Sequence, residues 1–151
     1  MRIDFFFNMN GNYRNQLIKL AEACEVSQRH IVPKGFNNSI HWQIGHVLTI
    51  TERLVFGISG QTNTLSHDYS EYFGTGTSPK EWKGNPPAWD LVIEHLKDQS
   101  IRIDETFRDK LEEPLSENRM RVETVEELIY VCMLHEVNHI GIVSAMNKAL
   151  K

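Results

Sequence analysis

The 151-residue sequence predicts an all-α fold, a four-helix bundle with a long connection between its second and third helices. Three observations predict it. Four stretches carry apolar residues at alternating three- and four-residue spacing, none shows sustained strand alternation, and a Gly- and Pro-rich segment separates the second stretch from the third. A chain of this length can bury one core, so we expect a single domain over residues 1–151.

The first predicted helix runs from near residue 3 to residue 31 and ends before Pro33 and Gly35. The second begins after Asn38 and Ser39, either of which is a suitable N-cap, and ends at Gly57 and Gly60. Their expected buried faces are Tyr13, Leu17, Leu20, Cys24, Ser27 and Ile31 in the first helix, and Ile40, Ile44, Val47, Thr51, Leu54 and Ile58 in the second.

Residues 59–87 form the long connection, and loops of this length inside a domain often serve a function. Ser78 and Glu81 have the spacing of a capping box, which predicts one helical turn over residues 79–83. The aromatic residues of this loop have two open interpretations: they close over one end of the bundle as an apolar substrate pocket, or they anchor the loop. These residues are Tyr69, Tyr72, Phe73 and Trp82.

The third predicted helix starts at the Pro86-Pro87 pair. The fourth begins at Thr124, where Glu127 completes a capping box. Their expected buried faces are Trp89, Ile93, Leu96, Ser100, Ile103 and Phe107 in the third helix, and Val125, Leu128, Cys132, His135, His139, Ile142, Met146 and Ala149 in the fourth.

Composition excludes several classes of protein. The net charge of −4 argues against a protein that binds nucleic acid through its phosphate backbone. The sequence shows no signal peptide and no run approaching the roughly 20 apolar residues of a membrane helix, so we expect no membrane partner. The two cysteines cannot form a disulfide framework, which favours a cytoplasmic location, and we expect both to be buried apolar residues.

His135 and His139 occupy successive positions of the predicted buried face, where a helix ordinarily carries Leu or Ile. Residues four apart on a helix lie one above the other, so both imidazoles are expected to point into the bundle. Burying two imidazoles costs desolvation free energy, and a shared metal ion offsets that cost. The alternative is a pair of core histidines bonded to hydroxyl or backbone groups.

The second helix offers His46 as the third ligand, since it lies beside the predicted core positions Ile44 and Val47 and the adjacent Gly45 permits close approach of another helix. The alternative is a core or boundary histidine that binds no metal. Gln43 and Thr49 lie within one turn of His46 and are candidates for polar support. The other histidines are expected outside the site. His41 is predicted at the surface, His30 near a helix end, and His95 on a polar face, while His67 and Cys132 are minor candidates as ligands.

Residues 135–139 read His-Glu-Val-Asn-His, which matches the H-E-x-x-H pattern of zinc proteases. We reject a protease because few residues follow for a downstream third ligand and no strand is predicted to align a substrate. Glu136 then either orients a metal ligand or is a solvated helix residue.

The segments Asn38-Ser-Ile-His-Trp-Gln-Ile-Gly-His46 and His135-Glu-Val-Asn-His139-Ile-Gly-Ile-Val143 resemble the DinB/YfiT-like family of metalloenzymes over nearly the whole chain. The resemblance implies a four-helix bundle with the metal ligands His46, His135 and His139, and zinc or nickel as the metal. Relatives include S-transferases that use the low-molecular-weight thiols bacillithiol or mycothiol, a mycothiol-dependent isomerase, and predicted hydrolases.

Three function hypotheses follow. The leading one is a metal-dependent thiol S-transferase that acts on small electrophiles, because three neutral ligands leave an open coordination position for a small-molecule substrate. The second is a metal-dependent hydrolase of a small amide or ester. The third is a non-catalytic metal-binding bundle that acts as a homodimer. No general acid or base can be assigned from the sequence.

Overall fold

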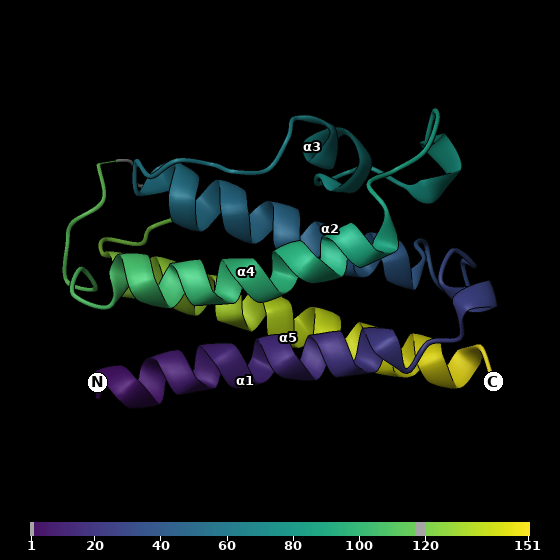
Figure 1. Cartoon of the computed structure of the whole chain (residues 1–151), viewed down its shortest axis with the longest axis horizontal. Coiled ribbons are helices and arrows are strands. Elements are labelled where there is room, and N and C mark those ends of the chain that lie inside the picture. Colours follow the sequence, from purple (N-terminus) through teal and green to yellow (C-terminus); the bar gives the residue numbers. More distant parts are fainter. Residues whose placement is uncertain (1, 117–119) are drawn as a thin grey trace.

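The computed structural model describes residues 2–116 and 120–151 and shows a bundle of four long helices (Figure 1). The long helices are α1 (Ile3–Glu22), α2 (Ile40–Thr51), which continues as the π-helical η2 (Glu52–Ile58), α4 (Trp89–Phe107) and α5 (Val125–Ala149). The short elements are the 3₁₀ turns η1 (Val26–Gln28) and η3 (Pro79–Glu81), with helix α3 (Asp68–Phe73) between the second and third long helices. The described residues form no strand beyond an isolated bridge between Pro114 and Thr124.

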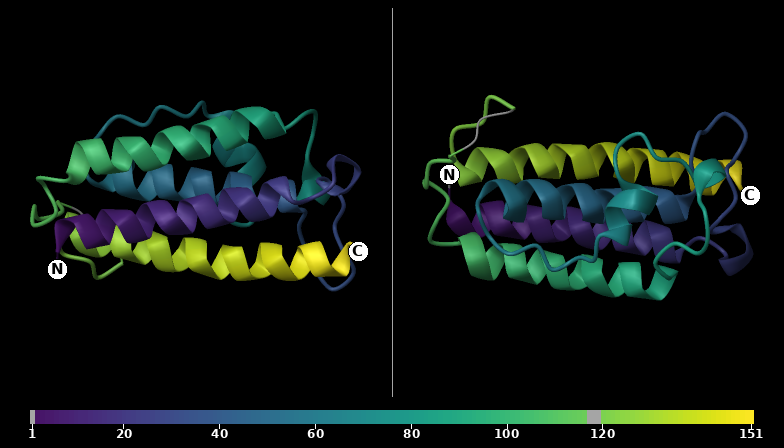
Figure 2. Two further views of the ribbon diagram at one scale, coloured as in Figure 1. Left: turned by 60° about the horizontal axis from the view of Figure 1, so that its bottom comes forward. Right: turned by 90° about the horizontal axis from the view of Figure 1, so that it is seen from above.

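The long connection sets the topology of the bundle. It brings the chain back along the length of α2, so that α4 runs parallel to α2, while α1 and α5 run the opposite way (Figure 1). α5 lies against α1 and α2, α4 lies against the same two helices, and α1 also contacts α2 across the bundle (Figure 2). The predicted four-helix bundle and its long connection are therefore confirmed.

The first helix ends nine residues earlier than the periodicity predicted. α1 stops at Glu22, and the chain turns through η1 before it reaches Pro33. The prediction extended the buried face to Ser27 and Ile31, but both side chains are exposed. A longer helix would therefore gain no stability from tertiary packing at these positions. The turn is held instead by Gln28, whose amide donates to the carbonyl of Leu150 at the end of α5 (2.7 Å).

The predicted start of the second helix is confirmed, since the Ser39 hydroxyl accepts a hydrogen bond from the backbone N–H of Trp42 (3.2 Å). Within this helix the buried face shifts from the predicted Leu54 to Val55 and Phe56. The wider π-helical turn η2 inserts one residue per turn, which rotates the following side chains by that amount.

The long connection contains the helical turn predicted near residue 79, as η3, and also the unpredicted helix α3. The capping box predicted there is wrong, because the Ser78 side chain caps no N–H. The capping box of α5 is confirmed: the Thr124 hydroxyl accepts from the N–H of Glu127, whose carboxylate accepts from the N–H of Glu123.

Among the described helices, α5 alone is long and apolar enough to cross a membrane, whereas the sequence predicts no segment of this kind. The core helix of a bundle meets the same criteria. α5 packs lengthwise against α1 and α2, and its inward positions include Leu128, Cys132 and Val143.

Candidate metal centre

Three histidines from two antiparallel helices come together inside the bundle. α2 supplies His46, and α5 supplies His135 and His139 one turn apart. Their candidate ligand nitrogens all lie within 4.8 Å of one another. His46 and His139 are each 7% exposed, and His135 is half-buried. The structure therefore assembles the predicted set, although residue spacing alone did not place His46 beside the pair.

Hydrogen bonds fix which nitrogen of each ring is free. The Nδ1 atom of His46 lies 2.7 Å from the carbonyl oxygen of Phe73, an acceptor, so Nδ1 carries the proton and Nε2 keeps its lone pair. The Nδ1 atom of His139 lies 2.5 Å from Oε1 of Gln43 and is oriented in the same way. Such bonds from the distal ring nitrogen are typical of metal-ligating histidines.

His135 leaves the group without a complete set of hydrogen bonds. Its Nε2 lies 3.0 Å from Nε2 of His139, while its Nδ1 is buried and has no partner. His139 presents a lone pair at Nε2, so a neutral His135 has two possible tautomers. If Nε2 of His135 carries the proton, it donates to His139, but the lone pair at the buried Nδ1 of His135 has no donor. If Nδ1 carries the proton, the two Nε2 lone pairs face each other, and a cation bound between them would remove this repulsion.

The electrostatics hold all three rings neutral at pH 7, the form that binds a metal. Burial lowers the pKa of His139 to about 3, with His135 and His46 adding to the effect. Burial and the neighbouring His46 lower the pKa of His135 to about 4. The pKa of His46 is lowered by burial, against the opposing hydrogen bond to Phe73. The donor set of three neutral imidazoles therefore fits zinc, nickel, copper or iron.

The walls of the site come from α2 and α3. The Trp42 indole stacks on the His46 ring at 4.4 Å between centroids with the rings 12° apart, and its N–H donates to the Thr77 hydroxyl (2.9 Å). Gly45 allows close approach as predicted, but of α3 rather than of a long helix, because a Cβ there would clash with the Phe73 ring. Thr49 bonds the carbonyl of Gly45 and contacts no histidine of the group by hydrogen bond.

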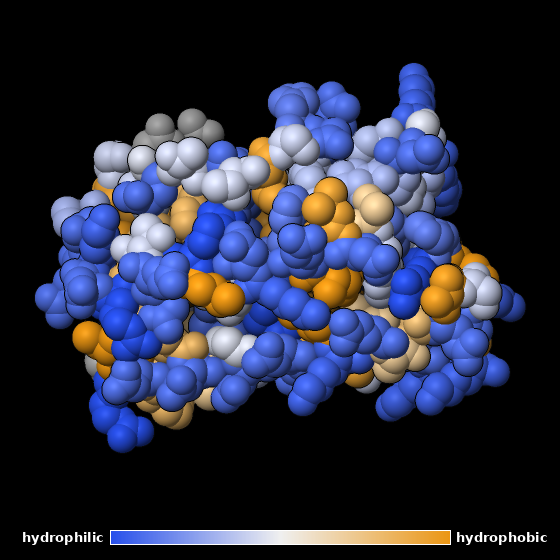
Figure 3. Space-filling view, viewed as in Figure 1, coloured by the Kyte–Doolittle hydropathy of each residue, from blue (hydrophilic) through white to orange (hydrophobic). Residues whose placement is uncertain are grey.

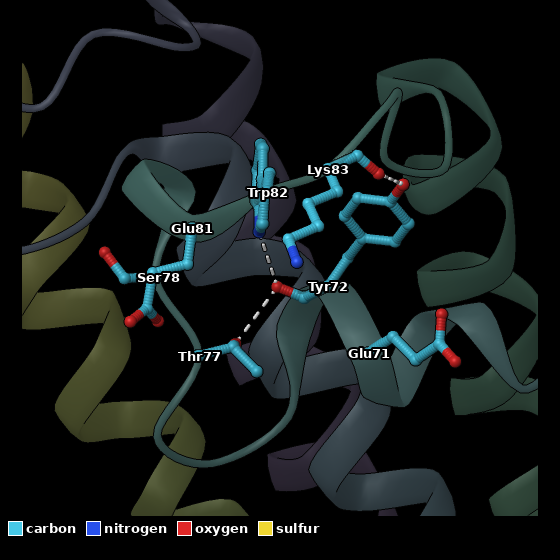
Figure 4. Close-up of a pocket in the computed structure, with 7 residues that line it drawn as sticks. All are labelled: Glu71, Tyr72, Thr77, Ser78, Glu81, Trp82 and Lys83. Carbon is cyan, nitrogen blue, oxygen red and sulfur yellow. Dashed lines mark hydrogen bonds between the residues drawn. The ribbon is translucent and has the colours of Figure 1, made fainter.

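The aromatic residues of the long connection divide between the two interpretations. Tyr69 and Phe73 are 2% and 0% exposed and anchor α3 in the core. Tyr72 and Trp82 line a surface pocket of about 230 Å³, but its lining includes none of the three histidines. Figure 4 shows the Trp82 indole and the Thr77 hydroxyl both directed at the carbonyl of Tyr72. Tyr69 and Phe73 therefore follow the anchoring interpretation, and the pocket lined by Tyr72 and Trp82 is separate from the histidines.

Three expectations about other histidines need correction. His41, predicted at the surface, is 1% exposed, because its ring lies among aromatic residues and its Nε2 donates to the carbonyl of Pro87 (3.0 Å). His30 lies in a turn beyond α1, with its Nδ1 3.2 Å from that of His41. His95 is half-buried and bonds the Tyr69 hydroxyl (2.9 Å). His67, a minor candidate as a ligand, is exposed and lies outside the group.

Glu136 has neither of the roles considered for it. It is 2% exposed, and its carboxylate accepts from Nε and Nη2 of Arg14 at 2.7 and 3.1 Å. Sequence reasoning missed Arg14, which is itself 2% exposed. A signal was present: Phe7, Asn10, Arg14, Leu17 and Ala21 keep the helical spacing of one buried face.

Cys132, a minor ligand candidate, is buried outside the histidine group, and burial raises its pKa to about 12.

The fold and site define a helical bundle with a buried three-histidine group suited to a metal ion. Residues 12–143 match the family described as the DinB superfamily, so the chain belongs to that superfamily, as the resemblance implied. A search of curated proteins gives no match.

Proposed function

We propose that this protein is a metal-dependent thiol S-transferase that joins a low-molecular-weight thiol to a small electrophile, with zinc or nickel held by His46, His135 and His139. The observation that carries the proposal is the convergence of three neutral imidazoles, of which His135 has a buried ring nitrogen without a partner. A bound divalent ion would supply Lewis acidity, which lowers the pKa of a thiol that reaches it.

The residues around the group support this use in distinct ways. The carbonyl of Phe73 and the amide oxygen of Gln43 hold the rings of His46 and His139 with their Nε2 lone pairs free. The Trp42 ring covers one face of His46 and excludes water there. Three neutral protein ligands leave a coordination position for an exogenous group, which structural sites lack.

A thiol is favoured over water as the nucleophile by the absence of a base in the described site. The only carboxylate beside the pair on α5, Glu136, is bound by Arg14, and the described metal group contains histidine alone. A free thiol has a pKa near 8.5, so a metal ion ionises it without a separate base, whereas hydrolases usually pair their metal with a general base. This observation ranks the amide or ester hydrolase second.

The test begins with metal content. The purified protein and the variants His46→Ala, His135→Ala and His139→Ala are analysed for bound transition metals, with exposed His67→Ala as the matched control. We expect one ion per chain in the wild type and in His67→Ala, and at least a tenfold loss of affinity in the other three. A wild type that takes up no zinc or nickel contradicts the proposal.

The second stage tests the reaction. Metal-loaded protein is incubated with thiols and chlorodinitrobenzene, and in parallel with amide and ester panels that contain no thiol. We expect thioether formation that depends on metal and is lost in His139→Ala. Hydrolysis without a thiol would favour the second function, and a metal-bound protein inactive in both assays would favour a non-catalytic bundle.

The same proposal includes the cellular location and the partners expected from the sequence. We propose a cytoplasmic protein without nucleic-acid or membrane partners, on the strength of its two cysteines and its net charge of −4. Fractionation of cells that produce the protein, followed by detection in the soluble and membrane fractions, checks the location.

A further inference from the structure

The long connection encloses a pocket of about 230 Å³, the Tyr72–Trp82 pocket, whose lining includes none of the three histidines (Figure 4). This volume corresponds to about eight water molecules, or to one small organic molecule. In Figure 3 the surface over this segment, at the upper right, is mostly hydrophilic, whereas apolar residues gather nearer the middle of the same face. The pocket therefore suits a small molecule that carries polar groups.

Hydrogen bonds to the backbone hold the walls of the Tyr72–Trp82 pocket. The Trp82 indole N–H donates to the carbonyl of Tyr72 (2.8 Å), and the Tyr72 hydroxyl donates to the carbonyl of Lys83 (2.7 Å). The two aromatic rings meet edge to face, with 5.8 Å between their centroids. Because the walls are already bonded, the pocket is preformed, which lowers the entropic cost of binding a ligand.

Three polar side chains of the pocket, by contrast, have no partner in the part of the chain that the structure describes. The hydroxyl oxygen of Ser78 is buried and makes no hydrogen bond. Glu81 and Lys83 are exposed and take part in none of the ion pairs between described residues. The fourth polar group at the rim, Glu71, lies 3.2 Å from Nδ1 of His67, and its carboxylate is directed away from the other side chains in Figure 4.

One cation and one anion therefore remain for a ligand. In Figure 4 the ammonium of Lys83 is directed into the middle of the group, while Glu81 and Ser78 lie on the other side of the Trp82 ring. Glu81 repels a simple anion and Lys83 repels a simple cation, whereas a molecule with both charges is attracted at both ends. The Ser78 oxygen is an additional acceptor on the side of Glu81.

From this arrangement we infer that the Tyr72–Trp82 pocket binds a small zwitterion of the α-amino acid class. Its ammonium lies at Glu81 and the Ser78 hydroxyl, its carboxylate at Lys83, and its side chain against the two rings. Two sources carry this head group: free amino acids, and thiols built on an amino acid. Only the second source rests on the proposed function.

The experiment is a titration of the full chain with leucine, followed by NMR at the indole N–H of Trp82. We expect saturation with a Kd of about 1 mM or tighter. Leucinamide lacks the carboxylate and N-acetylleucine lacks the ammonium, so each should bind about tenfold more weakly than leucine. Equal affinity for the three molecules would overturn the inference.

Variants assign each charge of the ligand to a side chain. In Lys83→Gln the preference for leucine over leucinamide should disappear, and in Glu81→Gln the preference for leucine over N-acetylleucine should disappear. Lys80→Gln is the matched control, because Lys80 is an exposed neighbour that does not line the pocket, and it keeps both preferences. Wild-type preferences in the two pocket variants would contradict the inference.

Ser78→Ala tests the hydroxyl without disturbing the fold, because that hydroxyl bonds nothing among the described residues. The Kd for leucine should rise about tenfold, since a hydrogen bond to a charged group is lost. Circular dichroism confirms that each variant is folded. An unchanged Kd would contradict the placement of the ammonium.

Amino acids also bind metal ions, so the titration is made with zinc present and again after a chelator has removed it. Binding in both states supports the pocket, whereas binding that requires zinc would place the amino acid on the ion and overturn the inference. Glutathione, which carries the same head group on a thiol, separates the two sources in the metal-free protein. A lower Kd than that of leucine assigns the pocket to a thiol, and a higher one assigns it to free amino acids. Failure of the S-transferase assay leaves these readings unchanged.

Discussion

Two polar clusters lie inside the same bundle, and they differ in how far the chain satisfies them. In the ion pair of Arg14 and Glu136, each guanidinium nitrogen and each carboxylate oxygen has a hydrogen-bond partner: the guanidinium also donates to the carbonyl of Leu96 (2.7 Å) and to Oε1 of Gln99 (3.1 Å). In the histidine group, the buried Nδ1 of His135 has no partner, and like groups face one another.

The difference teaches which cluster is structural and which is suited to a ligand. A buried charge pair is retained only when its remaining donors and acceptors are bonded, and Arg14 on α1 meets that condition through partners on α4 and α5. An incompletely bonded group costs free energy of folding unless something outside the chain completes it. The following predictions test that contrast, from the largest expected effect to the smallest.

Removal of Arg14 should cost the most. In Arg14→Met the carboxylate of Glu136 is left buried without its partner, which lowers the free energy of unfolding by about 3–5 kcal/mol. Urea denaturation measures it. The double variant Arg14→Met/Glu136→Leu removes both charges and should recover most of the loss; a single variant that loses less than about 1 kcal/mol would show that the pair is not structural.

His41 tests what burial alone does to an imidazole that has hydrogen-bond partners. Burial, aided by His30, lowers its pKa to about 4 from an ordinary 6.5, so the unfolded chain binds a proton that the folded chain does not. Stability is therefore complete above the unfolded pKa and is lost as the pH falls from about 6.5 toward about 4. The contribution is about 2–3 kcal/mol between about pH 7 and about pH 4.5.

The measurement compares wild type with His41→Phe by urea denaturation across that range. On acidification across this range, the variant should lose about 2–3 kcal/mol less unfolding free energy than the wild type. A constant loss from the unpaired carbonyl of Pro87 does not affect the comparison, since only the slope is read. Identical slopes in the two proteins would show that His41 does not carry the shift.

Gly45 tests how tightly α3 is held over the histidine group. In Gly45→Ala the new methyl group would clash with the Phe73 ring, which should cost about 1–3 kcal/mol of unfolding free energy. Gly11→Ala is the matched control, because Gly11 is also helical and a Cβ there meets nothing within 4 Å, and it should stabilise the chain by up to about 1 kcal/mol. Thermal denaturation of both variants checks the difference, and equal melting temperatures would contradict it.

Substitution of Gln43 should have the smallest effect, because Gln43 hydrogen-bonds to His139 but is not itself a candidate metal ligand. In Gln43→Ala the ring of His139 loses its Nδ1 partner, and zinc affinity should fall about tenfold, equivalent to about 1.4 kcal/mol. Competition with a chelator measures the affinity. Gln16→Ala on the exposed side of α1 should bind zinc like the wild type. An unchanged affinity in Gln43→Ala would remove Gln43 from the site.

Local patterns predicted most of the fold and the histidine pair, while His46 was proposed from its neighbour Gly45 and from the family resemblance. The three- and four-residue spacing and the caps at Ser39 and Thr124 located the helices, because these signals act over one or two turns. The pair His135 and His139 was visible for the same reason, since both residues belong to one helix. The early end of α1 and the π-helical turn η2 were not visible, because packing against other helices decides them.

The sequence by itself determined the helices and the histidine pair, both of which follow from residue spacing within one segment. Only the tertiary structure decided that His46 joins the pair, that Glu136 turns away to Arg14, and that His41 is buried. Each of these depends on contacts between residues far apart in the chain. The physical reason is that a side chain's pKa, partners and burial are properties of its neighbours, which the fold supplies.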